Sequence, residues 1–156
     1  MKALIQRVKR CSVWIDSTLH SSIPSGMLIL LGVGRFDNEA AVKHLVQRCS
    51  TLRIFDDGDG KMNLSILDVG GSAMVVSQFT LFGDTRKGNR PNYAEAAPPE
   101  IAERLYNLFV AELGSVLGKE RVSSGMFRAM MDVELVNDGP VTLMLESPPS
   151  KSGDRA

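Results

Sequence analysis

The segment Met27-Leu28-Ile29-Leu30-Leu31-Gly32-Val33 is the longest apolar run in the chain. Such a run is typical of a strand covered on both faces, because a strand with one face in water alternates apolar and polar residues. The turn signal Pro24-Ser25-Gly26 comes directly before it. We therefore expect a buried strand here, with other layers of the protein on both sides.

Other strands are expected around this segment. Ala3 to Ile15 alternates loosely and is rich in β-branched residues, and the turn Asp16-Ser17-Thr18 separates it from a strand near Leu19 to Ile23. The same patterns predict extended segments at Ile54-Phe55, Ala73 to Phe82, Val133 to Val136 and Val141 to Leu145. The chain should contain about seven strands, many of them adjacent and antiparallel.

Two segments have the apolar spacing of an amphipathic helix. Asp37 or Asn38 can cap the first. Its apolar stripe is Val42, Leu45, Val46, Cys49 and Leu52. The second begins at Pro98-Pro99-Glu100 and ends at Gly118. Met126 to Met131 should form a short helical turn. Strands and helices together predict a single α/β domain of mixed or antiparallel β-sheets with two main helices.

The composition describes one ordinary domain without a strong charge. Of the 156 residues we place 1–147 in the domain and expect the Pro- and Ser-rich tail, 148–156, to be disordered. The 18 basic and 18 acidic residues balance, so any RNA contact must use local patches. Three local basic groups are interpreted by default as solvated surface charges. They are Lys2/Arg7/Lys9/Arg10, Arg86/Lys87/Arg90 and Lys119/Arg121.

The cysteine pattern and hydropathy predict a cytoplasmic protein. Cys11 and Cys49 form no C-x-x-C motif and are best interpreted as free thiols in a reducing compartment. The first ten residues lack the apolar core of a signal peptide. No apolar run approaches the roughly 20 residues that a membrane-spanning helix needs.

Neither a metal site nor a histidine-based triad is expected. The acidic loop from Asp56 to Lys61 fails as an EF-hand, because Lys61 or Gly58 falls where an oxygen ligand is required. The two histidines, His20 in a polar loop and His44 on a helix, are expected at the surface. We therefore predict no metal and no cofactor, and any hydrolysis must proceed without a histidine base.

Two polar motifs remain, and residue chemistry alone predicts only a structural role for each. Ser77-Gln78-Phe79-Thr80 ends an apolar strand, where its hydroxyls could simply bond to the backbone. Asn137-Asp138-Gly139-Pro140 has the turn residues of a hairpin loop between two strands.

A family resemblance changes that interpretation. It rests on six pieces in order, which are Ala3 to Val8, Leu30 to Val33, Gly60 to Asn63, Val75 to Leu81, Lys87 to Pro91 and Val136 to Thr142. In these pieces the chain resembles the D-aminoacyl-tRNA deacylases, from the first strand to about Glu146. It departs from the family at Asn92-Tyr93, where Ser-Phe is frequent, and at Phe82-Gly83, where the family varies.

The resemblance implies an enzyme of translation quality control. Its substrate would be the ester between a D-amino acid, or mischarged glycine, and the 3′-terminal adenosine of tRNA. The fold would be barrel-like and layered, and the protein a homodimer with active sites at the interface. Ser77, Gln78, Phe79 and Thr80 would be the catalytic strand end, which binds the oxyanion largely through backbone N–H groups. Thr142 would be its neighbour in the pocket.

The resemblance also implies how water is activated and how L-substrates are rejected. Water activation is credited to the ribose 2′-hydroxyl of the RNA, while Thr80 as a nucleophile stays an open alternative. Gly139-Pro140 resembles a cis dipeptide that reaches into the partner's pocket, holds the substrate's amino group and leaves no room for an L side chain.

Two other classes of function stay open from the sequence. One is a non-catalytic module that binds the end of charged tRNA. The other is a structural or small-molecule-binding dimer in which both motifs are only turns.

Overall fold

The structure, a computed structural model, describes residues 1–149. Most of the tail expected to be disordered therefore lies outside the described residues. Within them, no helix combines the length and apolar character needed to cross a membrane.

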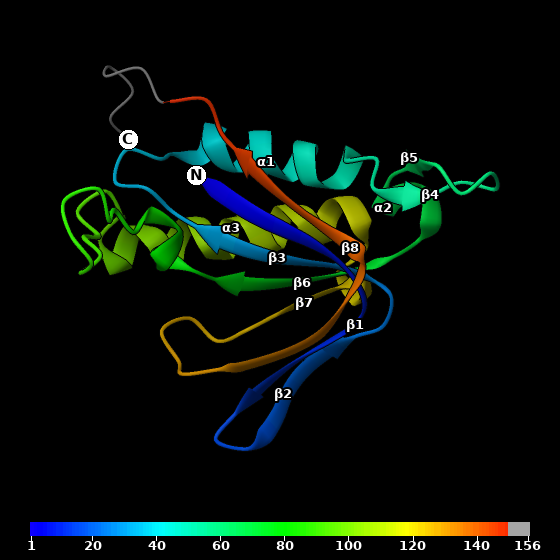
Figure 1. Cartoon of the computed structure of the whole chain (residues 1–156), viewed down its shortest axis with the longest axis horizontal. Helices are drawn as coiled ribbons and strands as arrows, with labels where there is room; N and C mark the ends of the chain where they lie inside the picture. The colour runs from blue at the N-terminus through cyan, green and yellow to red at the C-terminus, as the bar shows by residue number, and fades with distance from the viewer. Residues whose placement is uncertain (150–156) are drawn as a thin grey trace.

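One mixed sheet forms the centre of the domain (Figure 1). Its strands run in the order β2-β1-β3-β6-β7, and β8 pairs with β1 outside this order. Their bounds are β1 Lys2–Ile15, β2 Thr18–Ile23, β3 Gly26–Gly32, β6 Ser72–Ser77, β7 Val122–Ser124 and β8 Asp132–Glu146. β3 lies antiparallel to β1 and parallel to β6. The sheet curls until it is nearly closed, and the apolar β3 lies in its middle as expected.

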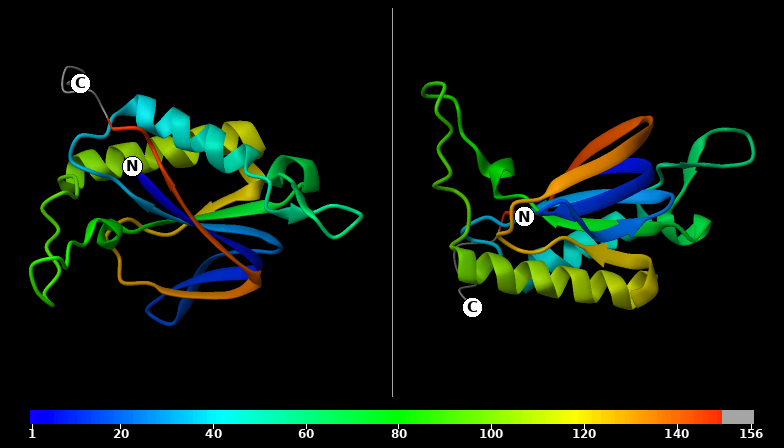
Figure 2. Two further views of the ribbon diagram at one scale, coloured as in Figure 1. Left: turned by 45° about the horizontal axis from the view of Figure 1, so that its top comes forward. Right: turned by 90° about the horizontal axis from the view of Figure 1, so that it is seen from below.

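Two long helices cover one face of this sheet (Figure 2). They are α1 Glu39–Thr51 and α3 Pro99–Leu117. Asn38 caps α1 by accepting a hydrogen bond from the Ala41 N–H. The main core lies between these helices and the sheet, and a second apolar cluster around Val8, Cys11 and Met74 fills the other side.

Smaller elements complete the domain. They are β4 Phe55–Asp56, β5 Met62–Leu64, α2 Ile66–Val69 and the 3₁₀ turns η1 Phe79–Phe82 and η2 Lys119–Arg121. The third helix, α2, was not expected, because a single turn has no apolar period. Its own signal is a capping box between Ser65 and Asp68.

Several sequence expectations were wrong at element ends. The strand expected to continue to Phe82 ends at Ser77, because the chain turns into η1. Residues 126–131 form turns and irregular backbone rather than a helical turn, and His20 lies in β2 rather than in a loop.

The largest correction concerns the Asn137–Thr142 motif. The two strands expected on either side of a hairpin are one strand, β8, and both of its halves pair with β1. The register shifts between Gln6 and Val8 and again between Val8 and Arg10. The motif is therefore a bulge along a continuous strand, and its turn residues form the bulge rather than a hairpin.

Gly26 should be the position in the sheet least tolerant of a side chain. It pairs with Ser72 in the parallel β3–β6 ladder, and a Cβ on Gly26 would lie 1.7 Å from the Ser72 carbonyl oxygen. Because both partners are backbone held by strand pairing, Gly26→Ala should lower the free energy of unfolding by about 3 kcal/mol or more. Chemical denaturation measures this. Gly58→Ala is the control, since a Cβ there meets nothing within 4 Å, and similar losses in both variants would contradict the prediction.

Candidate active site

A cavity of about 910 Å³ opens where β6 ends. η1, the start of α3 and residues 127–131 form its other walls. Its lining is mainly apolar and includes Val76, Ala97, Phe127 and Met131. A mostly apolar concavity of this size with a few polar groups is typical of a small-molecule or cofactor-sized binding site.

The predicted residues Ser77, Gln78, Phe79 and Thr80 all line this cavity. The Gln78 N–H donates to the Leu31 carbonyl at 2.8 Å and so continues the pairing of β6 with β3. The chain then turns into η1, whose first backbone bond joins the Leu81 N–H to the Gln78 carbonyl. Within residues 1–149 the N–H groups of Phe79 and Thr80 have no hydrogen-bond partner. These two donors are free to bind an oxygen of a ligand.

Polar and aromatic side chains form one part of the mouth. The Gln78 amide donates to the Thr80 hydroxyl, which orients both groups. The rings of Phe79 and Tyr93 meet edge to face with 5.0 Å between centroids. Tyr93, at a position where the chain departs from the family pattern, thus forms part of the pocket rim.

Among the lining residues none has a carboxylate, imidazole, thiol or amine side chain. The titratable groups are Tyr93, Tyr106 and Arg128. The Tyr106 hydroxyl donates to the Val75 carbonyl at 2.9 Å, and burial raises the pKa of this phenol to about 12. It stays protonated at neutral pH and is therefore not suited to be a general base. The rest of the described chain, residues 1–149, contains no cluster of three potential metal ligands.

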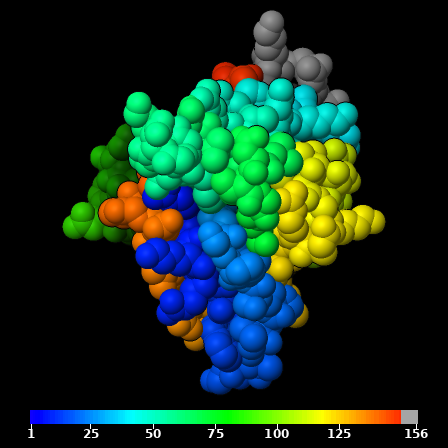
Figure 3. Space-filling view, turned by 90° about the vertical axis from the view of Figure 1, so that its right-hand side faces the viewer, coloured from blue at the N-terminus to red at the C-terminus, as the bar shows by residue number. Residues whose placement is uncertain are grey.

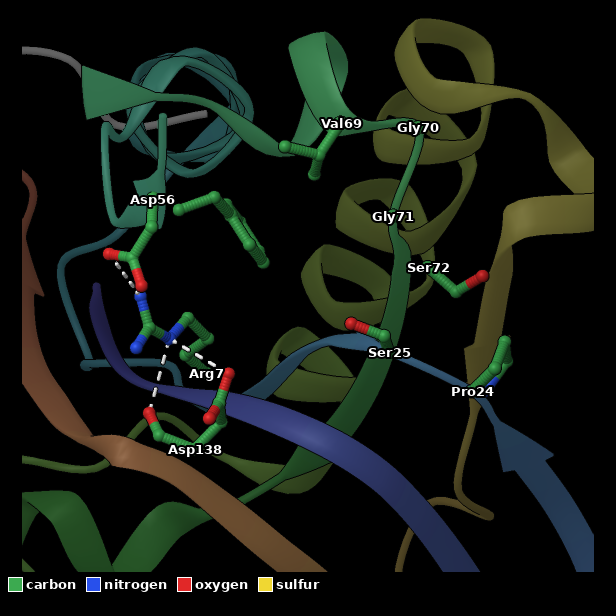
Figure 4. Close-up of a pocket in the computed structure, with 10 residues that line it drawn as sticks. Arg7, Pro24, Ser25, Asp56, Val69, Gly70, Gly71, Ser72 and Asp138 are labelled. Atoms are coloured by element: carbon green, nitrogen blue, oxygen red, sulfur yellow. Dashed lines mark hydrogen bonds and ion pairs between the residues drawn. The ribbon is translucent and has the colours of Figure 1, made fainter. Parts of the chain in front are cut away.

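The second motif is organised around Arg7 (Figure 4). Arg7 is only 7% exposed. Its Nε donates to the Asp138 carbonyl at 3.1 Å, and one terminal nitrogen donates to the Ile54 carbonyl at 2.7 Å. Ion pairs join it to the Asp56 carboxylate at 3.2 Å and to that of Asp138 at 3.3 Å. A cavity of about 420 Å³ lies beside this cluster.

Arg7 corrects the interpretation of the first basic group as solvated surface. Its burial could have been predicted from the alternation of side chains along a strand, because Ala3, Ile5 and Arg7 share one face of β1 and the first two are fully buried. An arginine in phase with buried apolar residues must find oxygen partners, and the bulge in β8 provides one of them.

The Asn137–Thr142 segment has a defined shape. The Gly139–Pro140 peptide bond is cis, as the resemblance implied, and Gly139 has a φ of 127°. The Asn137 side chain closes the loop, since its amide donates to the Val141 carbonyl and its oxygen accepts from the Val141 N–H, both at 3.1 Å. The Thr142 hydroxyl accepts from the Gln6 amide at 3.2 Å.

One chain does not bring the two motifs together. Gly139 and Pro140 are exposed, and neither they nor Thr142 line the 910 Å³ cavity. In the space-filling view this orange part of β8 lies at the surface below the β4–β5 hairpin, drawn in teal (Figure 3).

Fold and site together define a single-domain α/β protein whose pocket offers backbone donors to a ligand and no basic side chain suited to remove a proton. The model of the D-Tyr-tRNA(Tyr) deacylase family matches residues 4–146. This chain belongs to that family, which confirms the resemblance drawn from the six sequence pieces.

Individual relatives agree with this assignment. A D-aminoacyl-tRNA deacylase of Thermosipho africanus is 52% identical over 147 residues, covering 94% of this chain and 97% of the relative. One from Salinibacter ruber is 53% identical over 146 residues, with the same shares covered.

Solved structures show the same fold. A c-Myc DNA unwinding element binding protein superposes with a TM-score of 0.91 at 41% identity, covering 95% of this chain and 99% of that one. A probable eukaryotic D-amino acid tRNA deacylase superposes with a TM-score of 0.82 over 93% of this chain and 98% of that one. At 15% identity the second likeness concerns the fold alone.

Arg7→Met should destabilise the protein, because it leaves the Ile54 and Asp138 carbonyls and two carboxylates without their donor. The carboxylates are partly exposed, so water compensates in part and we expect a loss of about 2 kcal/mol. Lys9→Met, at an exposed position of the same strand, should change the free energy of unfolding by less than about 0.5 kcal/mol. Equal urea midpoints for the two variants would contradict the role given to Arg7.

Proposed function

We propose that this chain hydrolyses the ester bond of D-aminoacyl-tRNA and spares the L-aminoacyl form. The observation that carries the proposal is the Ser77–Thr80 strand end, which forms the wall of the main cavity in a member of this family. Release of the free D-amino acid and tRNA would serve chiral proofreading in translation. A module that only binds tRNA ends is not favoured, since the similar relatives are named deacylases.

In this proposal the terminal adenosine and its aminoacyl group occupy the 910 Å³ cavity. Water attacks the ester carbonyl carbon, and the oxygen that becomes negative lies at the free N–H groups of Phe79 and Thr80. Donors already in place for developing charge are an efficient way to lower such a barrier. The bond from this carbon to the ribose oxygen then breaks, and the ribose leaves with a proton.

Water activation is assigned to the ribose 2′-hydroxyl of the substrate. The support is chemical, because none of the lining residues has a carboxylate, imidazole, thiol or amine side chain that could act as a general base. Thr80 is the alternative nucleophile, but no base lies beside it, and its hydroxyl already accepts a hydrogen bond from the Gln78 amide.

Chiral selection is assigned to Gly139 and Pro140 of a second copy of the chain. Their exposed position and the rigid loop made by Arg7 and Asn137 suit a segment that inserts into another subunit. There its carbonyl oxygens would hold the substrate's amino group, and an L side chain would clash. Glycine has no side chain, so glycyl-tRNA should also be a substrate. Thr142 would lie near the same pocket.

Apolar residues at the cavity mouth support a homodimer with interfacial sites. Met130 is 90% exposed and Phe79 is 59% exposed. Leu143 and Met144, which follow the Gly139–Pro140 segment on β8, are also exposed. Exposed apolar side chains of this kind, beside the pocket and along the second motif's strand, are typical of a surface that is covered in the assembly.

The purified protein should release tyrosine from D-tyrosyl-tRNA and leave L-tyrosyl-tRNA intact, without added metal. Ester loss is followed with labelled tyrosine, in the presence and absence of a chelator. Equal rates on the two enantiomers, or loss of activity with the chelator, would refute the proposed function.

If the RNA supplies the catalytic hydroxyl, Thr80→Ala should keep turnover within about 10-fold of the parent, the size of one lost hydrogen bond. A D-tyrosyl-tRNA ending in 2′-deoxyadenosine should react more slowly by about 100-fold or more, the usual scale of general acid–base assistance. Single-turnover rates on both substrates measure this. An inactive Thr80→Ala variant with a normal rate on the deoxy substrate would establish the threonine as nucleophile instead.

A further inference from the structure

Residues 83–93 form a finger that stands out from the domain beside the cavity (Figure 2). Its base is a pair of backbone bonds between Asp84 and Asn92, at 2.8 and 2.9 Å. Gly88, with a φ of 129°, lies in the turn at its far end. The finger contains three basic side chains, Arg86, Lys87 and Arg90, and one carboxylate, Asp84, for a net charge of +2 in a chain whose net charge is zero.

The single carboxylate is already occupied. Arg86 donates to both oxygens of Asp84, at 2.9 and 2.7 Å. This pairing lowers the pKa of Asp84 to about 2, so the carboxylate is ionised throughout the physiological range. Arg86 therefore helps to shape the finger, and two exposed cations are left over. In the described part of the chain, residues 1–149, no ion pair involves Lys87 or Arg90.

The finger is attached to the wall of the cavity. It begins directly after η1, whose Phe79 ring contacts the Tyr93 ring at the finger's other end. Arg128, on another part of the cavity lining, adopts a left-handed backbone conformation with a φ of 63°. The mainly apolar cavity thus has one cation, Arg128, in its lining, and the basic finger is attached to another part of its wall at Tyr93. Positive charge on two segments around a pocket favours the approach of an anionic ligand.

We propose that Lys87 and Arg90 bind backbone phosphates of the acceptor arm of the tRNA while its terminal adenosine occupies the cavity. The inference rests on the proposed function. An RNA strand that leaves the cavity has phosphates on every nucleotide, and lysine and arginine contacts to them give affinity without reading sequence. In a chain with no net charge, the finger thus offers this strand two neighbouring cations whose only nearby finger carboxylate, Asp84, is already paired with Arg86.

The test compares a long and a short substrate. The Lys87→Ala/Arg90→Ala double variant is assayed on D-tyrosyl-tRNA and on the D-tyrosyl ester of the trinucleotide CCA, which lacks the acceptor stem. Because the variant lacks both phosphate-binding side chains, kcat/KM on the tRNA should fall about 10-fold at low salt. The slope of log kcat/KM against log salt should become shallower by about 1.4–1.8. The rate on the short ester should not change.

Two control variants separate charge placement from charge count. Lys61→Ala/Lys119→Ala removes the same charge from the β4–β5 hairpin and from η2, which lie away from the finger (Figure 1), and should behave as the parent. Lys87→Arg/Arg90→Lys keeps both charges and should retain most of the activity on tRNA, because phosphate contacts of this kind need charge more than geometry.

Each other outcome has a definite meaning. A parent protein inactive on both esters refutes the proposed function and leaves the finger without a substrate to bind. An active parent with an unaffected double variant overturns the inference alone. An equal loss on both esters also overturns it, because the finger would then act on the pocket. A changed sedimentation coefficient of the double variant overturns it as well, because the finger would then be a contact between copies of the chain.

Discussion

Strand β1 hydrogen-bonds to three other strands, and this pairing determines where both functional motifs lie. Its antiparallel ladder with β3 aligns the apolar centre of the sheet. β3 in turn pairs with β6, whose last residue, Ser77, lies opposite Leu31. Its second edge pairs with β8 along almost the whole of both strands. Because side chains alternate along β1, the same register turns Arg7 inward, where it meets the bulge of β8.

The inward arginine makes the bulge a rigid feature rather than a loose loop. A buried guanidinium without acceptors would be costly, so the backbone carbonyls of Ile54 and Asp138 are held where they satisfy it. The β4 segment and the Gly139–Pro140 loop thereby share one anchor. A loop that selects substrates by a clash needs this kind of support, because a flexible loop would yield to the L side chain.

The chemistry of the pocket depends on its apolar side chains as well as on its hydrogen-bond donors. In the proposed function the two free N–H groups would stabilise the oxyanion, whereas the apolar walls and a tyrosine kept neutral by burial cannot remove a proton from water. An aminoacyl ester is already activated, so such a site suffices if the substrate contributes its own hydroxyl. In the proposed mechanism this division of labour would also explain why the signatures need no histidine beside them.

The sequence by itself determined the α/β class, the buried β3, the presence of both long helices, and the family, because each of these depends on local periodicity, capping or a fixed order of motifs. The tertiary structure decided that β8 is one strand instead of a hairpin and that Arg7 is buried. Strand pairing with a distant segment and the oxygen partners of a side chain are set by packing across the whole chain, and no local pattern around residues 137–142 encodes which strand lies beside them. It also decided that Ser77–Thr80 and Gly139–Pro140 lie apart within one chain, since only the nearly closed shape of the sheet sets the distance between the end of β6 and the bulge of β8.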